Sequence, residues 1–260
     1  AGYMANAITL PAGTRNNRVI APGAEDIAGP TGAKARVFLA MNARPGMVYE
    51  QGTAFVPAFQ IDPMLPVAMK FTLNYPDGRQ VVAQGTGDAS GSWAGAAATL
   101  DVPGVYRYTV DADWNGHKGI VPGLPAEGGM MFVIDRERPA NAPRLGFNLP
   151  PLSRFDAARG ITFAGTSTAA TVYYAAVIPG AVIGQGTLPV TGGRFQYVFD
   201  PVAINRTTPT YDTTNATTKL PELGDVVHFT FFAPEKMSDG RVVWSFVRLI
   251  IRGSTVHYTR

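Results

Sequence analysis

Residues 99–118 read TLDVPGVYRYTVDADWNGHK, and this stretch decides the fold class. From Tyr106 to Trp114 every second residue is Tyr, Val, Ala or Trp, and the residues between them are Arg, Thr and Asp. Side chains of a strand alternate between the two faces of a sheet, so this period of two predicts a β-strand with one buried and one solvent-facing side. The dipeptide Asn115-Gly116 then tolerates the positive φ angles of a tight turn. We therefore expect a strand that turns back at once as a hairpin.

The residues ahead of this strand resemble the tyrosine corner of immunoglobulin-like and fibronectin-III-like domains. In the sequence LDVPGVYRY, residues 100–108, the turn dipeptide Pro103-Gly104 leads into the strand and Tyr106 stands at the corner tyrosine. Tyr108 stands where true immunoglobulin domains carry a cysteine. The resemblance implies that the Tyr106 hydroxyl bonds back to the backbone near the corner. It concerns the fold and transfers no function.

Both halves of the chain carry further segments with the same period. Residues 67–75, 194–199 and 226–233 alternate between apolar and polar positions. Residues 242–252, VVWSFVRLIIR, are apolar on both faces, which indicates a strand that is covered on both sides. No long stretch has helical periodicity, and 29 Gly and 21 Pro favour short strands and turns. The predicted fold class is all-β, with two tandem antiparallel β-sandwiches of immunoglobulin-like or fibronectin-III-like type.

The sequence divides into four predicted parts. Residues 1–32 form an extended N-terminal arm, residues 33–137 the first β-sandwich, residues 138–158 a Pro-rich linker and residues 159–260 the second β-sandwich. The arm is expected either to lie on the first domain or to donate a strand to an open sheet edge of a neighbouring subunit. A Thr-rich insertion at 200–224 carries two glycosylation sequons, which suggest a surface position.

Composition excludes several classes of protein. The net charge of +3 is small and the basic residues are scattered, so nucleic acid is not an expected partner. The chain has no cysteine, which excludes a disulfide framework and a thiol nucleophile. No run approaches 18 apolar residues, so no membrane span is expected. Because the chain opens on Ala1, we expect a mature exported protein that is extracellular, at the cell surface or periplasmic.

Asp111, Asp113 and Asn115 are the candidate metal ligands. They match the first half of a calcium loop, D-x-D-x-N-G, in which alternate oxygen ligands converge on a hard cation. The twelfth position is Pro122, where that loop needs a bidentate Glu. The same residues are also explained as a strand end followed by a hairpin turn. Calcium is thus a possible ligand, and no other cofactor is expected.

No catalytic residue is assigned. The loop GDASG at residues 87–91 is similar to the GDSGG of serine proteases but contains an extra Ala, and it also fits a flexible Gly-Ser loop. His117, His228 and His257 all follow this loop, whereas that family has its histidine upstream. A β-sandwich hydrolase is therefore the third hypothesis for the function, and the protein is expected not to be an enzyme.

The leading hypothesis is a structural, adhesive or assembly protein of the extracellular space or cell envelope. It would act through sheet edges and end loops, and its partner would be a second copy of the chain, as in a filament, or a neighbouring envelope subunit. The alternative is a carbohydrate-binding or accessory module of a secreted hydrolase, with a glycan as partner. That alternative requires solvent-facing aromatic residues, for which Trp93, Trp114 and Trp244 are the candidates.

Overall fold

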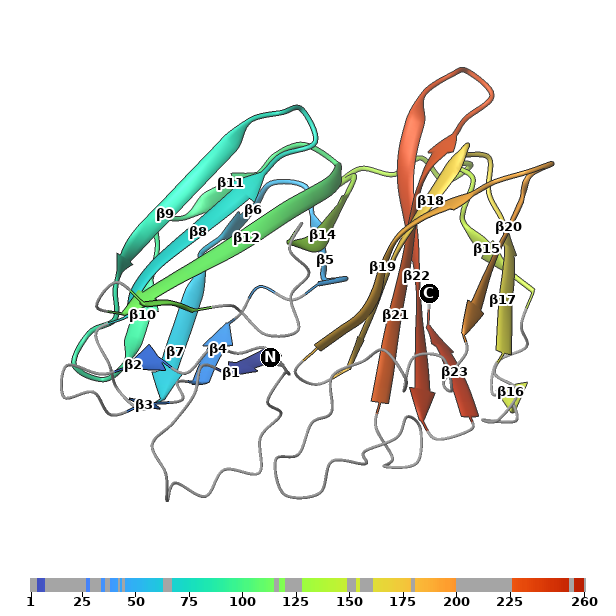
Figure 1. Ribbon diagram of the computed structural model, residues 1–260. Helices are drawn as coiled ribbons and strands as arrows, with labels where there is room; N and C mark the ends of the chain where they lie inside the picture. The colour runs from blue at the N-terminus through green and yellow to red at the C-terminus, as the bar shows by residue number, and fades with distance from the viewer. Residues whose placement is uncertain are drawn as a thin grey trace.

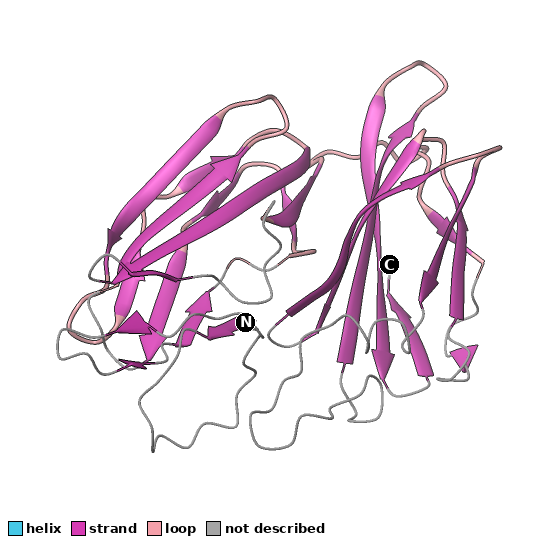
Figure 2. Cartoon of the chain, in the orientation of Figure 1, coloured by secondary structure: helices cyan, strands magenta, loops and turns pink. Residues whose placement is uncertain are grey.

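The structure is a computed structural model of the chain. It describes residues 4–7, 27–28, 34–35, 38–41, 43, 45–62, 67–114, 117–119, 128–148, 153–154, 161–178, 181–199, 226–252 and 255–259. Every regular element in these ranges is a β-strand, and the strands form two tandem sandwiches (Figures 1 and 2). Their described strand pairs are antiparallel except for β5 (Val48–Glu50) and β14 (Gly129–Ile134), which pair in parallel. The all-β prediction is confirmed. No helix of a length and hydropathy that could span a membrane occurs in the described ranges.

The first sandwich packs one sheet of order β1-β4-β7-β10 and the small pair β11-β6 against a sheet of order β5-β14-β12-β8-β9. The first group comprises β1 (Met4–Ala7), β4 (Phe38–Met41), β6 (Thr53–Phe55), β7 (Ala58–Asp62), β10 (Ser92–Ala94) and β11 (Ala98–Leu100). The second comprises β5 (Val48–Glu50), β8 (Ala68–Asn74), β9 (Gln80–Thr86), β12 (Gly104–Trp114) and β14 (Gly129–Ile134), with β13 (His117–Gly119) paired to the end of β12. A separate short pair joins β2 (Ile27–Ala28) to β3 (Lys34–Ala35).

The second sandwich packs a sheet of order β15-β17-β20 against one of order β16-β23-β22-β21-β18-β19. The smaller sheet comprises β15 (Gly146–Phe147), β17 (Ile161–Thr166) and β20 (Arg194–Phe199). The larger comprises β16 (Ser153–Arg154), β18 (Thr171–Ile178), β19 (Ala181–Pro189), β21 (Val226–Lys236), β22 (Val242–Arg252) and β23 (Thr255–Thr259). Its two longest strands, β21 and β22, pair in continuous register from Val226↔Arg252 to Lys236↔Val242.

Aromatic side chains fill both cores, as the alternating segments predict. In the first sandwich Tyr106 and Tyr108 of β12 are fully buried, and the Tyr108 ring stacks on Phe71 of β8 at 5.6 Å between centroids. In the second, Phe163 of β17 lies 5.2 Å from Phe229 of β21. Burying one such side chain stabilises the fold by about 1.5–3 kcal/mol, so these rings dominate the energetics of each sandwich.

The predicted tyrosine corner is present. The Tyr106 hydroxyl accepts a hydrogen bond from the Val102 amide at 3.1 Å and donates one to the Val102 carbonyl at 2.9 Å. Gly104 opens the strand at a φ of +141°, a conformation that favours glycine, and a Cβ there would lie 2.9 Å from Pro76. The corner thus requires both the glycine and the tyrosine hydroxyl.

The structure describes strands within the predicted arm and within the predicted linker. Of the arm at 1–32, the structure describes Met4–Ala7 as β1, paired with β4, and Ile27–Ala28 as β2. The insertion at 200–224 lies outside the described residues, as do its sequons. Within the predicted linker at 138–158, the structure places β15, which pairs with β17. The reason is apolar burial, since Leu145 and Phe147 enter the second core.

Replacing Tyr106 by Phe removes the corner hydroxyl and leaves the Val102 amide without its acceptor. We expect the free energy of unfolding to fall by about 1–3 kcal/mol. Burial also raises the pKa of Tyr106 to about 12, whereas the unfolded chain releases this proton near pH 10. The unfolded state therefore binds fewer protons between these pH values, and native stability should fall as the pH rises through them. Denaturant titrations at pH 8 and pH 11 measure both effects, and Tyr106→Phe should flatten the pH dependence.

The matched control for this experiment is Tyr173→Phe. Tyr173 packs near Trp244 in another part of the molecule, so its hydroxyl has no part in the tyrosine corner. Equal losses of stability in the two variants would contradict a structural role for the corner hydroxyl.

Candidate functional site

A third buried cluster lies between the two sandwiches and joins them. It contains Met130 and Phe132 of β14, Ala175 of β18 and Phe232 of β21, all with no exposed surface. The rings of Phe132 and Phe232 stack across the junction at 4.7 Å between centroids, and Trp244 of β22 stacks on Phe232 at 4.6 Å. The two sandwiches therefore share a core-like contact, which we call the junction cluster.

Two strands supply the junction cluster because both of their faces are apolar. In β14, Met131 and Val133 point into the first core, while Met130 and Phe132 point into the junction. In β22, one face packs into the second core, and Trp244 and Phe246 of the other face pack on the junction cluster. The strand at 242–252 was expected to be covered on both sides, and its second cover is the other sandwich.

Hydrogen bonds between the sandwiches surround the cluster. The buried Thr230 hydroxyl donates to the Gly46 carbonyl at 2.8 Å. The Gln185 side-chain amide donates to the Gly128 carbonyl at 2.6 Å, and the Trp244 amide donates to the Asp135 carboxylate at 2.7 Å. Each bond fixes one orientation of the sandwiches, because hydrogen bonds weaken steeply with angle.

Arg138 ties the segment that follows β14 to the second sandwich. Its guanidinium donates to the Trp244 carbonyl at 2.7 Å and to the carbonyls of Pro143 and Ala142. Desolvation lowers the pKa of Arg138, and the positive charge of Arg144 lowers it further. A planar guanidinium presents several donors in a fixed fork, so one side chain holds three carbonyls of two segments together.

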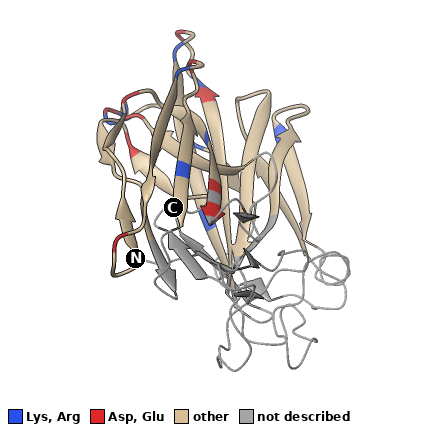
Figure 3. Cartoon of the chain, turned by 60° about the vertical axis from the view of Figure 1, so that its left-hand side comes forward, with Lys and Arg blue, Asp and Glu red and all other residues tan. Residues whose placement is uncertain are grey.

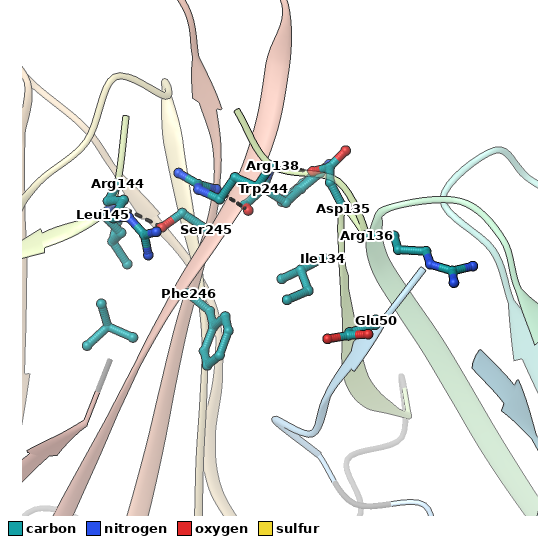
Figure 4. A pocket seen from close by; sticks show the side chains of 11 residues that line it. Glu50, Ile134, Asp135, Arg136, Arg138, Arg144, Leu145, Trp244, Ser245 and Phe246 are labelled. Carbon is teal, nitrogen blue, oxygen red and sulfur yellow. Dashed lines mark hydrogen bonds between the residues drawn. The ribbon is translucent and has the colours of Figure 1, made fainter. Parts of the chain in front are cut away.

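A cavity of about 240 Å³ opens beside Arg138 at this junction (Figure 4). Charged side chains of both signs line it together with the aromatic rings of Trp244 and Phe246. The charged lining residues are Glu50, Asp135, Arg136, Arg138 and Arg144. Within the described part of the chain, no hydrogen bond or ion pair engages the guanidinium groups of Arg136 or Arg144. A lining of rings and free polar groups suits the binding of a small polar molecule.

The sequence reasoning missed these cavity residues, although a signal for them exists. Asp135, Arg136, Glu137, Arg138 and Arg144 stand close together in a chain with only 16% charged residues. The predicted domain division places Asp135, Arg136 and Glu137 at the end of the first sandwich, and Arg138 and Arg144 in the linker. The signal is ambiguous, because charged residues are expected both in a solvated linker and at the solvent-exposed rim of a binding site.

The candidate calcium ligands are only partly placed. Asp111 and Asp113 lie two residues apart in β12, and Asp111 stands opposite Lys70 of β8. Asn115 lies outside the described residues. The described residues hold no group of three or more His, Cys, Asp or Glu side chains that could bind a metal ion. Trp114 pairs with His117, which agrees with a two-residue hairpin connection, and calcium stays a prediction.

The loop at residues 87–91 is held by its own acidic side chain. The Asp88 carboxylate accepts hydrogen bonds from the Ser90 amide at 2.8 Å, the Ser90 hydroxyl at 2.6 Å and the Ser92 amide at 3.0 Å. These bonds, the one from the Ser90 side chain above all, lower the pKa of Asp88. The arrangement is that of a capped turn, in which carboxylate and serine stabilise the loop together.

Two of the three tryptophans take part in packing. Trp93 is 9% exposed and stacks on Phe59 at 5.0 Å, inside the first core. Trp244 stacks on the junction cluster and borders the cavity. The side chain of Trp114 lies outside the described residues. Trp93 is therefore unsuitable as a solvent-facing platform for a sugar, and Trp244 is the candidate that remains next to a cavity.

Charge is sparse over the described surface. Figure 3 shows acidic and basic residues scattered singly over the strands and gathered at some end loops, with most of each strand carrying neither sign. This agrees with the scattered basic residues of the sequence and gives no continuous basic surface in that view.

Comparison with known proteins adds a likeness to two solved structures. A chimeric titin Z1Z2-Z1Z2 tandem, functionalised with a GRGDS peptide from fibronectin, is 14% identical, with 79% of this chain and 96% of that chain covered and a TM-score of 0.23. A tetra-tandem repeat from the extending region of a large adhesion protein is 13% identical, with 96% of this chain and 66% of that chain covered and a TM-score of 0.24. At such TM-scores neither likeness supports a conclusion about function. No family model matches the chain, and no curated protein matches it.

Replacing Phe132 by Ala removes one ring of the stack that joins the sandwiches. We expect the loss of about 3–5 kcal/mol that is typical of a buried Phe. Because the lost contact couples the two sandwiches, calorimetry should show their unfolding as two separated transitions, and X-ray scattering should show a larger radius of gyration.

Phe71→Ala is the matched control, because Phe71 lies within the first core and touches no residue of the second sandwich among its ring contacts. This control should weaken the first sandwich without changing the scattering of the native state. A Phe132→Ala protein with unchanged scattering and one transition would refute the coupling.

Proposed function

We propose that the protein is a non-enzymatic structural module of the extracellular space or cell envelope, which joins to other proteins through the open edges of its sheets. The observation that carries this proposal is the junction cluster. Two domains in one chain normally move relative to each other unless their interface is large and apolar. Here four fully buried residues and the Phe132–Phe232 stack join the domains. The pair is thus suited to act as one stiff spacer.

Open sheet edges supply the means of contact. The sheet orders end at β9, β10, β19 and β20, and the described strands leave one side of each without a partner in its sheet. The free N–H and C=O groups of such an edge pair readily with an added strand. In this mode the backbone gives the affinity and the alternate side chains give the specificity. Assembly and adhesion proteins need this kind of contact more than they need a catalytic cleft.

The N-terminal strand provides one such added strand. β1 pairs antiparallel with β4 in the register Met4↔Met41 to Ala7↔Phe38, at the edge of the first sandwich. A strand that completes an edge within its own chain can complete the same edge of a neighbour, as in domain swapping. The arm at 1–32 is therefore proposed to link copies or envelope subunits, and a filament or adhesive surface would follow from repetition of this contact.

Deleting residues 1–32 should abolish the self-association that runs through the arm, because the exchanged strand is lost, and assemblies larger than a dimer should no longer form. Two shorter deletions sharpen the test: removal of 1–7 takes away β1, whereas removal of 1–3 leaves it whole. Sedimentation velocity over a wide concentration range, with electron microscopy for filaments, measures the outcome. If the 1–7 deletion associates as strongly as the 1–3 deletion, the arm has no part in assembly.

A second candidate function is supported by the junction cavity. Trp244 and Phe246 border it together with the guanidinium groups of Arg136 and Arg144, which form no hydrogen bond or ion pair with the described residues. Aromatic faces beside polar side chains are the usual surroundings of a bound sugar. Under this alternative the protein is a carbohydrate-binding or accessory module of a secreted hydrolase. Titration with neutral and uronic-acid oligosaccharides should then change the tryptophan fluorescence, and Trp244→Phe should remove most of that change. An unchanged spectrum at millimolar sugar would rule out this alternative.

A further inference from the structure

β9 is the outermost strand of its sheet and leaves one side open. It pairs with β8 along its whole length, from Asn74↔Gln80 to Ala68↔Thr86, and the described residues offer it no second strand. Figure 1 shows β9 on the margin of the first sandwich, away from the second. An approaching chain could therefore reach this edge without disturbing the junction cluster.

Hydrogen bonds at both ends of the β8–β9 pair show which residues of β9 face outward. The Tyr75 amide donates to the Arg79 carbonyl at one end, and the Gly87 amide donates to the Val67 carbonyl at the other. Both pairs belong to the same register, in which hydrogen-bonded and non-hydrogen-bonded pairs alternate. The odd-numbered residues of β9 thus bond to β8. The even-numbered residues Gln80, Val82, Gln84 and Thr86 direct their amide and carbonyl groups away from it.

The side chains of this edge also favour pairing. The four outward residues are exposed, and Val82 is 44% exposed. β9 contains no charged residue and no proline. Natural sheets usually protect an open edge with lysine, proline, a bulge or a very short strand. A seven-residue edge in regular register has none of these protections.

We propose that β9 pairs antiparallel with β9 of a second copy of this chain, about a two-fold axis at Ala83. This inference rests on the proposed assembly function and names its contact surface. In this register Val82 stands opposite Gln84 of the second copy, and Gln80 opposite Thr86. All four outward residues then bond to one another, whereas an axis at residue 81 or 85 would leave some of them unpaired.

The register is also self-complementary in chemistry. Each cross-strand pair joins an amide or hydroxyl side chain to an uncharged partner, so no like charges face each other. A two-fold contact uses the same patch on both copies and therefore closes as a dimer. The sheet of order β5-β14-β12-β8-β9 would continue through β9 into the second copy. Combined with arm exchange at the opposite sheet, such dimers would form a chain of copies.

Cysteine pairs test the register directly, because the chain has no cysteine of its own. Val82→Cys and Gln84→Cys are made separately in the full chain, mixed in equal amounts and oxidised. Directly opposite residues of a hydrogen-bonded pair lie about 5.5 Å apart at Cα, within the range of a disulfide. We expect a heterodimer between the two variants in at least five-fold excess over the homodimers that either variant forms.

Val198→Cys and Gln196→Cys on β20 form the matched control, because they have the same residue types and spacing and are likewise exposed on another edge strand. Little cross-linking is expected from this mixture. Equal cross-linking of the two mixtures would show random collision and overturn the proposal. If the disulfide forms only after the arm is deleted, the arm and not a second copy of β9 occupies this edge. That result would also overturn the proposal.

A second variant tests the contact without cysteine. Val82→Pro removes an outward N–H and keeps the bonds to β8, so the domain should still fold. We expect its dimer dissociation constant, measured by sedimentation equilibrium, to rise at least ten-fold over that of the unaltered chain. If the unaltered chain associates and Val82→Pro associates equally, the β9 contact is wrong while the assembly function stands. If the unaltered chain stays monomeric at millimolar concentration, both proposals fail.

Discussion

The stacking of Phe132 on Phe232, with Trp244 behind it, is the contact on which the structure of the whole chain depends. Each sandwich has a core of its own and could bury its rings alone. Their fixed relation comes from the junction cluster, because aromatic pairs add about 0.5–1.5 kcal/mol each beyond the burial of their area. Without the junction cluster, the chain segment that follows β14 would be the covalent connection between the sandwiches and would allow them to change their relative orientation. Stiffness is therefore a property of one apolar contact and its surrounding hydrogen bonds.

Partly buried polar groups at the junction give this contact its specificity. Arg138 donates to the Trp244 carbonyl, and the Asp135 carboxylate accepts from the Trp244 amide. These bonds form in only one orientation of the segment between the sandwiches. In the second sandwich, the fully buried Glu235 carboxylate accepts hydrogen bonds from the Ser167 hydroxyl and from the amide and hydroxyl of Thr168. These bonds hold the β17–β18 loop on β21. A buried carboxylate without such donors would be strongly destabilising, so the loop and the long hairpin β21–β22 are fixed together.

The sequence permitted prediction of the features that depend on local pattern. The period of two placed Tyr106 and Tyr108 in the first core, and the turn at Pro103-Gly104 predicted the tyrosine corner. The double-faced apolar pattern of residues 242–252 predicted full cover but left open whether the cover came from the same sandwich or the other one. That choice depends on tertiary packing, as does the entry of Leu145 and Phe147 into the second core. The outward residues of β9 needed the strand register, which a single sequence does not provide.

Residual dipolar couplings of backbone amides measure the central claim most directly, because they report the orientation of each sandwich in the intact chain. If the junction cluster makes the tandem one stiff body, the couplings of the first and second sandwiches will fit a single alignment tensor. Two tensors of clearly different magnitude would show independent motion. That result would contradict the stiff spacer on which the account of this protein rests.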